Sequence, residues 1–350
     1  MKYKDDVVAA ILKEISLTPD FLKGKQLSTI YFGGGTPSIL SSEDFALIFN
    51  QLEAHYSLDC LKEVTVECNP DDVTPDFIRG LEGTPVNRYS LGVQSFYDDD
   101  LRALNRTHTK KQVFQAIELI AHSNAKSWTL DLIYGLPEMT MERWMSNLQM
   151  THAVDAPHIS AYALTVEPRT ALYHFIQKRQ LRLPDDGQVT AHFDALMRWA
   201  GERGYEHYEI SNYALRGHRA VHNSSYWEGQ AYLGLGPGAH SFDGAFIRRW
   251  NVRNNPIYVR KIARGEVPYT SEMLTPDDLY NEYVMTRLRL SSGVSRMDLS
   301  GMGERYLHRF EEAISPHVES TLIQLSEGHW RLTDAGKHFA DRIASDAFII

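Results

Sequence analysis

The chain of 350 residues is 43% hydrophobic, which is enough for a large core and a second, smaller domain. Its net charge of -9 argues against a nucleic-acid partner, which would require a basic face, and no apolar run of about twenty residues predicts a membrane span. Two cysteines in so long a chain argue against a disulfide-stapled secreted fold and favour a reducing compartment. We therefore expect a cytoplasmic protein.

Residues 3–17 carry apolar side chains at helical spacing and predict an amphipathic helix. Short β-branched segments then alternate with amphipathic segments up to about residue 210. The predicted strands are 28–32, 63–67, 88–93, 128–133, 158–164 and 205–210, and the predicted helices are 41–55, a short one from Pro75, 110–122, 141–154 and 188–203. This alternation predicts parallel strands joined by crossover helices, as a closed or partial α/β barrel or as an open doubly wound sheet.

The pattern changes after residue 211. Residues 217–244 are rich in Gly, His, Asn and Tyr, which is typical of a loop, and helical patterns return from about Thr275. Residues 328–337 predict a short hairpin followed by a helix, so we expect a small, mostly helical, winged-helix-like domain that serves in packing rather than in DNA binding. The predicted parts of the chain are 1–215, a connecting region 216–274, and 275–350.

Glycine or polar residues stand at the carboxyl ends of the predicted strands, where ligands bind in α/β barrels. In chain order they are Gly33-Gly34-Gly35-Thr36, Glu67, Gln94, Asp131 and Tyr162. Three successive glycines let a backbone approach a ligand closely, or they form only a tight turn. Their spacing is that of neither a phosphate-binding Walker loop nor a dinucleotide site.

Glu67 and Asp131 are carboxylates in apolar sequence contexts, where a charge is costly unless it is paired or bound to a ligand. One use of such a carboxylate is to accept hydrogen bonds from the hydroxyls of a ribose. The alternative is a salt bridge, for example to Arg106. Arg106 could also grip a ligand carboxylate, or be an exposed arginine at a helix end.

Five segments occur in a fixed order: Gly-Gly-Gly-Thr-Pro at 33–37, Val-Glu-Cys-Asn-Pro at 66–70, Gly-Val-Gln-Ser-Phe at 92–96, Asn-Arg-Thr-His at 105–108 and Asp-Leu-Ile-Tyr-Gly-Leu-Pro at 131–137. Together they resemble the oxygen-independent coproporphyrinogen III oxidase family of radical S-adenosylmethionine (SAM) proteins, along essentially the whole chain. The resemblance implies a SAM-binding (β/α) barrel over 1–215, with SAM and a [4Fe–4S] cluster as cofactors. The SAM site it implies comprises Gly34, Gly35, Thr36, Glu67, Gln94, Arg106, Asp131, Ala163 and His240.

This family has an oxidase branch, which decarboxylates the propionates of coproporphyrinogen, and a heme chaperone branch, which binds heme and hands it to an acceptor protein. The segment His222-Asn-Ser-Ser-Tyr226-Trp227 resembles the motif of the chaperone branch. The resemblance thus implies a heme chaperone, with His222 as ligand of the heme iron and with Tyr226 and Trp227 packed on the porphyrin. The alternatives are a structural histidine under an aromatic lid, a radical oxidase, and a nucleoside- or phosphate-binding barrel related to neither.

The chain departs from the family where the cluster is bound. The family carries Tyr-x-His-Ile-Pro-Phe-Cys-x-x-x-Cys-x-x-Cys before its first long helix, whereas this sequence begins at that helix. A [4Fe–4S] cluster needs three or four thiolates, and Cys60 and Cys68 have neither the place nor the spacing of its ligands. We expect a partial barrel without its first strand, no radical chemistry by this chain, and an edge at Thr29 and Tyr31 that is exposed or covered by a second copy. Three explanations of the missing cluster segment compete: an internal methionine mistaken for the start of the protein, a deliberate truncation, and a degenerate family member that binds without chemistry. We favour the first, because the other motifs are intact.

Overall fold

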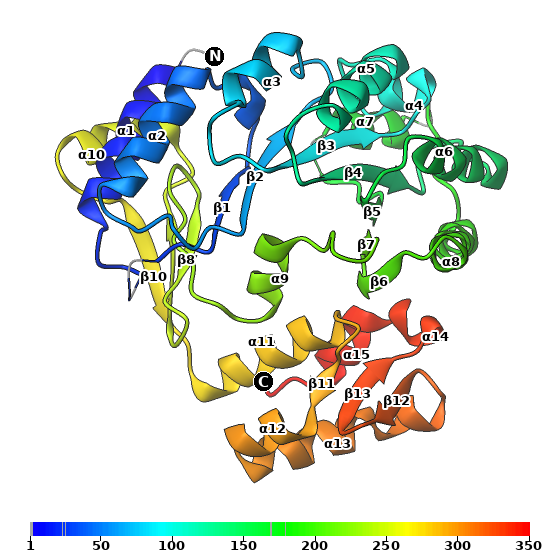
Figure 1. Cartoon of the computed structure of the whole chain (residues 1–350). Coiled ribbons are helices and arrows are strands. Elements are labelled where there is room, and N and C mark those ends of the chain that lie inside the picture. The colour runs from blue at the N-terminus through cyan, green and yellow to red at the C-terminus, as the bar shows by residue number, and fades with distance from the viewer. Residues whose placement is uncertain (1–2, 23, 25, 169, 179) are drawn as a thin grey trace. The chain divides into compact units, whose positions relative to one another are not determined.

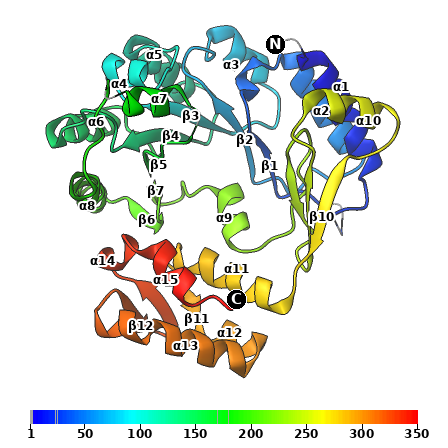
Figure 2. The ribbon, with the colours of Figure 1, turned by 180° about the vertical axis from the view of Figure 1, so that it is seen from behind.

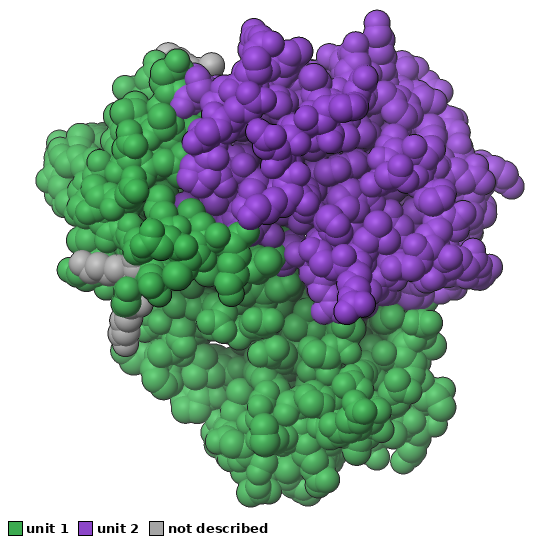
Figure 3. All heavy atoms as spheres, viewed as in Figure 1, with its two compact units in different colours: residues 1–29, 43–62, 221–350 green, residues 30–42, 63–220 purple. Residues whose placement is uncertain are grey.

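The protein is described from a computed structural model, which covers residues 3–22, 24, 26–168, 170–178 and 180–350. The chain folds as two compact units, each discontinuous in the sequence (Figure 3). Unit 1 comprises residues 1–29, 43–62 and 221–350, and unit 2 comprises residues 30–42 and 63–220. The three-part division predicted above stays a prediction, and Met1 and Lys2, at the predicted start, lie outside the described residues.

Unit 2 is built on a seven-stranded sheet with the order β1-β2-β3-β4-β5-β7-β6 (Figure 1). Its strands are β1 (Thr29–Phe32, whose first residue Thr29 belongs to unit 1), β2 (Glu63–Cys68), β3 (Arg88–Gln94), β4 (Ser127–Tyr134), β5 (His158–Ala163), β6 (Glu206–Glu209) and β7 (Asn212–Ala214). The pairs β2–β3, β3–β4 and β4–β5 are parallel, as the sequence predicts. The predicted α/β architecture is thus present in this part of the chain.

Helices cover the apolar side of this sheet (Figures 1 and 2). They are α3 (Pro75–Leu81), α4 (Asp98–Ala103), α5 (Lys110–Ala121), α6 (Met141–Ala153) and α8 (Asp186–Glu202). Unit 2 also contains a short 3-10 helix at Pro37–Ile39 and α7 (Ala171–Gln177). Thr74, Thr109 and Asp185 cap α3, α5 and α8 by accepting hydrogen bonds from backbone amides of the first turn. Alternate strand residues such as Val66 and Leu130 are fully buried beneath these helices.

The predicted sixth parallel strand is wrong in its direction. Strand β6 pairs antiparallel with β7, and β7 lies between β6 and β5, with which it is also antiparallel. Only Ile210 and Ser211 separate β6 from β7, which leaves no room for the crossover connection that a parallel pair requires. The described sheet therefore ends at β6 on one edge and at β1 on the other, as an open, partial barrel.

Strand β1 at the edge is less exposed than expected. Thr29 and Tyr31 are half-buried, so the prediction that they are exposed is wrong for this chain by itself. Covering of the edge by a second copy, and loss of a first strand ahead of β1, stay predictions.

In unit 1, α1 (Lys4–Leu17) packs against α10 (Asn255–Ala263). Glu14 of α1 is buried and accepts hydrogen bonds from the Gly236 amide, the Asn251 side chain and the Tyr258 hydroxyl, at 2.8, 2.6 and 2.5 Å. The remaining elements of this part are α2 (Ser42–Glu53), α9 (Val221–Trp227) and an antiparallel sheet of β8 (His240–Phe242), β9 (Ile247–Asn251) and β10 (Tyr269–Met273) in the order β10-β9-β8. The prediction of a loop over 217–244 is wrong, because this range contains α9 and β8.

The last part of unit 1 begins with α11 (Pro276–Leu288). It continues with β11 (Val294–Ser295), α12 (Arg296–Met302), α13 (Glu304–Glu319), β12 (Ile323–Ser326), β13 (His329–Leu332), α14 (Asp334–Lys337) and α15 (Ala340–Asp346). The predicted hairpin is β12–β13, with Glu327 and Gly328 in its turn at positive φ, and a helix follows it as expected. No helix in the described ranges is long and apolar enough to cross a membrane.

Candidate functional site: a polar sheet face and an aromatic helix

One face of the parallel strands in unit 2 is polar. Successive residues of a strand point to opposite faces, so the residues that alternate with the buried Val and Leu share the other face. Hydrogen bonds across the strands confirm this for Ser90 with Asp131 and for Arg88 with Thr129. The polar face carries Glu63, Thr65, Glu67, Arg88, Ser90, Gln94, Thr129, Asp131, His158, Ser160 and Tyr162.

The glycine run after β1 is tied to the end of β2. The Gly34 amide donates to Glu67 Oε2 at 3.1 Å, and the Tyr31 hydroxyl donates to Glu67 Oε1 at 2.8 Å. Gly34 and Gly35 have φ of +73° and +119°, which favours glycine, and a Cβ on either would meet nothing within 4 Å. A Cβ on Gly33 would lie 2.9 Å from Glu67 Oε1. The run is therefore a loop with open space beside two of its residues, a geometry that fits both a ligand-binding loop and a tight turn.

Gln94 ends β3 in an unusual conformation. Its φ of 66° is rare for a residue with a side chain, and the pairing of β3 with β4 shifts register between Leu91 and Gln94. As a result the Gln94 amide folds back over the strand, where a Cβ on Gly92 would lie 3.0 Å from its Nε2. Such strain is concentrated at functional sites, and here it brings an amide onto the polar face.

Asp131 is the carboxylate whose ionisation is most perturbed on this face. The Ser90 hydroxyl donates to its Oδ2 at 3.1 Å, and burial raises the pKa of Asp131 to about 7, with a further contribution from the negative charge of Glu67. Arg106 is exposed, whereas the two carboxylates are bonded to Ser90, Tyr31 and Gly34. The alternative of a salt bridge to Arg106 is therefore wrong in the described structure.

Three other predicted residues of the SAM site lie at different places. Thr36 is half-buried and precedes the short helix at Pro37–Ile39, and Ala163 is exposed at the end of β5. His240 is exposed on β8 in unit 1, where its ring stacks on that of Trp250 with centroids 6.1 Å apart. The roles of Thr36, Ala163, Arg106 and His240 stay predictions.

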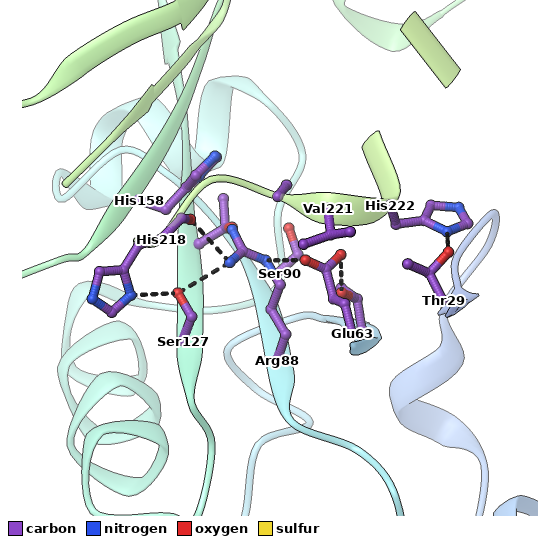
Figure 4. Close-up of polar contacts among 12 residues, drawn as sticks. Thr29, Glu63, Arg88, Ser90, Ser127, His158, His218, Val221 and His222 are labelled. Atoms are coloured by element: carbon purple, nitrogen blue, oxygen red, sulfur yellow. Dashed lines mark hydrogen bonds and ion pairs between the residues drawn. The ribbon is translucent and has the colours of Figure 1, made fainter. Parts of the chain in front are cut away.

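The predicted heme residues lie on α9 in unit 1. His222 Nδ1 is 2.7 Å from Thr29 Oγ1 (Figure 4). Its Nε2 is 3.1 Å from the Tyr226 hydroxyl. The two rings of His222 and Tyr226 meet edge to face with centroids 4.9 Å apart, as residues four positions apart on a helix can. Tyr226 in turn contacts the ring of Tyr232, with centroids 4.6 Å apart. Burial raises the pKa of Tyr226 to about 12, so its hydroxyl keeps its proton at neutral pH.

Trp227 lies beside a cation. The Arg289 guanidinium is 5.3 Å from the centre of its ring. No residue of α9 is buried, although the helix carries a histidine, a tyrosine and a tryptophan. The three predicted heme residues thus lie on one short helix, where His222 and Tyr226 are in contact, Tyr226 is exposed, and His222 and Trp227 are half-buried.

A buried polar cluster at the amino ends of the strands was not foreseen from the sequence. Arg88 is 3% exposed and donates to Ser127 Oγ at 3.0 Å and to the His218 carbonyl at 3.3 Å (Figure 4). Its Nε lies 4.0 Å from Glu63 Oε2, and the His218 ring is 3.0 Å from Ser127 Oγ. Burial lowers the pKa of Arg88, whereas the negative charge of Glu63 acts to raise it. A charged residue at the start of each of two apolar strands is the signal that could have found it.

The cysteines do not fit a [4Fe–4S] cluster. Cys60 is exposed in unit 1 and Cys68 is buried in unit 2, where burial raises the pKa of its thiol. Two cysteines cannot supply three thiolates. In the described ranges no three His, Cys, Asp or Glu residues are grouped so that they could hold a metal ion.

Comparison with known proteins identifies the family. The radical SAM superfamily model matches residues 4–150, and the HemN C-terminal domain model matches residues 274–339. The solved structure of coproporphyrinogen III oxidase (HemN) from Escherichia coli, a radical SAM enzyme, shares the fold, with a TM-score of 0.84 and 20% identity. The match covers 99% of this chain and 84% of that chain. The predicted α/β fold of the radical SAM type is therefore confirmed.

Two proteins named heme chaperone HemW are similar along nearly the whole chain. That of Bacillus subtilis (strain 168) is 33% identical over 343 residues, 97% of this chain and 90% of its own length. That of Escherichia coli (strain K12) is 30% identical over 347 residues, 97% of this chain and 89% of its own length. These matches confirm the resemblance stated from the motifs. The chain belongs to the radical SAM superfamily and, within it, to the family of the heme chaperone HemW proteins.

Proposed function

We propose that this protein is a heme chaperone that binds heme at His222 and transfers it to an acceptor protein. The observation that carries the proposal is helix α9, none of whose residues is fully buried and on which His222, Tyr226 and Trp227 lie. Aromatic side chains that stay partly exposed to solvent are typical of a binding surface. A histidine among them supplies a nitrogen for heme iron, and the rings supply apolar area for the porphyrin. The relatives named heme chaperones support the same function.

We further propose that SAM binds on the polar face of unit 2. The open loop at Gly34 and Gly35 and the strained Gln94 amide fit a polar ligand, and so do the Glu67 and Asp131 carboxylates at the same strand ends. Thr36, Arg106 and Ala163 belong to the same proposed site, and the role of His240, which lies in unit 1, stays a prediction. SAM bound next to a reduced cluster supplies a radical in this superfamily, but Cys60 and Cys68 do not fit a cluster, so we derive no radical step. These residues would bind and orient SAM.

A heme titration tests the chaperone function. Adding ferric heme to the full chain should shift the Soret band at a one-to-one ratio. His222→Ala should lose most of the shift, because it removes the iron ligand. His308→Ala, a change at an exposed histidine of α13, should leave the shift intact. If His222→Ala binds heme as the unchanged protein does, the assignment of His222 is refuted.

A second measurement separates the chaperone from the oxidase. The same preparation should produce no decarboxylated product from coproporphyrinogen under reducing conditions with SAM. Product formation by this chain would overturn both the chaperone proposal and the expectation of no radical chemistry.

A further inference from the structure

We infer that Thr29 is a positioning residue that directs the iron-binding nitrogen of His222, and that the Tyr226 hydroxyl covers this nitrogen until heme arrives. This inference rests on the proposed heme function of His222. It assigns opposite effects on heme binding to two hydroxyl groups that contact the same imidazole ring.

The geometry places one hydroxyl on each ring nitrogen. Thr29 Oγ1 is 2.7 Å from Nδ1, and the Tyr226 hydroxyl is 3.1 Å from Nε2. Thr29 is half-buried at the start of β1 and lies 193 residues before His222. Its β-branched side chain has few rotamers, so the position of its hydroxyl is well defined by the backbone.

The acidity of the two hydroxyls decides where the imidazole proton resides. A neutral imidazole carries one N–H and one lone pair, and only the nitrogen with the lone pair can bind iron. A phenol is more acidic than an alcohol and is the stronger hydrogen-bond donor, so Tyr226 donates to Nε2. Nδ1 then carries the proton and donates it to Thr29 Oγ1. In this tautomer Nε2 holds the lone pair that heme iron needs.

Thr29 therefore acts on iron through the far side of the ring. A hydrogen bond from Nδ1–H fixes the orientation of a ligating histidine and raises the basicity of the other nitrogen. Such partners of ligating histidines typically contribute about 10–100-fold to metal affinity. Loss of the Thr29 hydroxyl should weaken heme binding without removing the ligand.

Tyr226 acts in the opposite direction. Its hydroxyl stands at the nitrogen that iron must reach, so this hydrogen bond has to break before ligation. The Tyr226 side chain is 41% exposed and can turn away without opening the core. Removing the hydroxyl while keeping the ring should therefore favour heme binding, by about threefold for the loss of one ordinary hydrogen bond.

The experiment compares heme affinities of Thr29→Val, Thr29→Ser and Tyr226→Phe in the full chain, measured by Soret titration with ferric heme. We expect Thr29→Val to bind about tenfold more weakly, Thr29→Ser to bind as the unchanged protein, and Tyr226→Phe to bind more tightly. Thr286→Val is the matched control, because it removes a half-buried hydroxyl that bonds only to the backbone carbonyls of Glu282 and Tyr283. It should leave heme affinity unchanged.

A spectroscopic readout separates positioning from general damage. The iron–histidine stretching frequency of the ferrous complex, measured by resonance Raman, should fall in Thr29→Val and return in Thr29→Ser, because the hydrogen bond at Nδ1 strengthens the iron–nitrogen bond. If His222→Ala loses heme binding while Thr29→Val keeps both affinity and frequency, the inference is overturned and the proposed function stands. If His222→Ala keeps heme binding, the proposed function fails and the inference fails with it.

Discussion

The polar face of β2, β3 and β4 and the surface of α9 are the two candidate binding regions, and they are built in different ways. On the sheet, backbone pairing places Glu67, Ser90 and Asp131 within hydrogen-bonding networks on one face. On α9, no residue is buried, and His222 is oriented by Thr29 from a distant part of the chain and by Tyr226 of its own helix.

This difference suggests that the regions respond differently to substitution. A site held by a sheet is sensitive to volume and to buried charge, because neighbouring groups cannot move away. A site on a short helix with no fully buried residue tolerates changes in volume better, and its function depends on single hydrogen bonds and on the identity of the ligand. We expect substitutions in the sheet mainly to lower stability. Substitutions at His222, Thr29 and Tyr226 should mainly change heme affinity.

A substitution at Arg88 should give the largest effect and is therefore the strongest test of the difference between the sheet and α9. Arg88→Met should lower the free energy of unfolding by about 3–5 kcal/mol, because it removes the positive charge that faces the buried Glu63 carboxylate. Urea unfolding followed by circular dichroism measures this loss. Arg102→Met is the control: Arg102 pairs with Asp99 on the surface, and such pairs contribute about 0–1 kcal/mol. A loss below about 1 kcal/mol for Arg88→Met, the level of a surface pair, would show that the cluster is not a rigid part of the sheet.

Gly33→Ala should have a smaller effect on the same sheet. The added Cβ would meet the Tyr31 ring and would lie 2.9 Å from Glu67 Oε1, so the loop or the carboxylate must shift, at a cost of about 1–3 kcal/mol. SAM affinity, measured by isothermal titration calorimetry, should fall because Glu67 moves. Gly201→Ala in α8 is the matched control, since a Cβ there meets nothing within 4 Å and φ is not positive. Equal SAM affinity in the two variants would argue against a SAM site at Glu67.

The regular part of this fold could be predicted from local sequence. Long alternating segments and capping residues such as Thr109 predict β2 to β5 and the helices between them, and the polar residues at the strand ends predict the face with Glu67 and Asp131. Short elements could not be predicted in the same way. Strand β7 has three residues and α9 buries none, so neither has a periodic apolar pattern to detect.

Contacts between distant residues were also beyond the sequence. Thr29 and His222 are 193 residues apart, and Arg88 and His218 are 130 apart, so no local pattern links them. The heme and SAM roles came from resemblance of motifs rather than from periodicity. What structure adds to the motif at 222–227 is the pair of hydroxyls that contact the histidine.

The smallest effect we expect is a pH dependence of SAM binding that comes from the buried carboxylate Asp131. Helix α9 has no carboxylate, so this dependence would be a property of the sheet face alone. The pKa of Asp131 is raised to about 7 by burial and by Glu67, so this carboxyl gains its charge only as pH rises through about 7. SAM carries a cationic sulfonium and hydroxyls that donate, both of which favour the ionised form. Its affinity should therefore rise up to about tenfold between roughly pH 6 and 8, and level off above, because one pKa unit corresponds to about a factor of ten.

Asp131→Asn should remove this rise, because the amide does not titrate while the hydrogen bond with Ser90 can persist. Titration calorimetry of both proteins with SAM across this pH range measures the effect. For the free energy of unfolding, we expect the Asp131 contribution to fall, rather than rise, with increasing pH. A folded pKa above the unfolded value means that the folded state holds its proton more tightly, so the Asp131 contribution to stability is largest below about pH 4 and declines as pH rises to about 7. An unchanged pH profile in Asp131→Asn would show that Asp131 does not control the pH dependence of SAM binding.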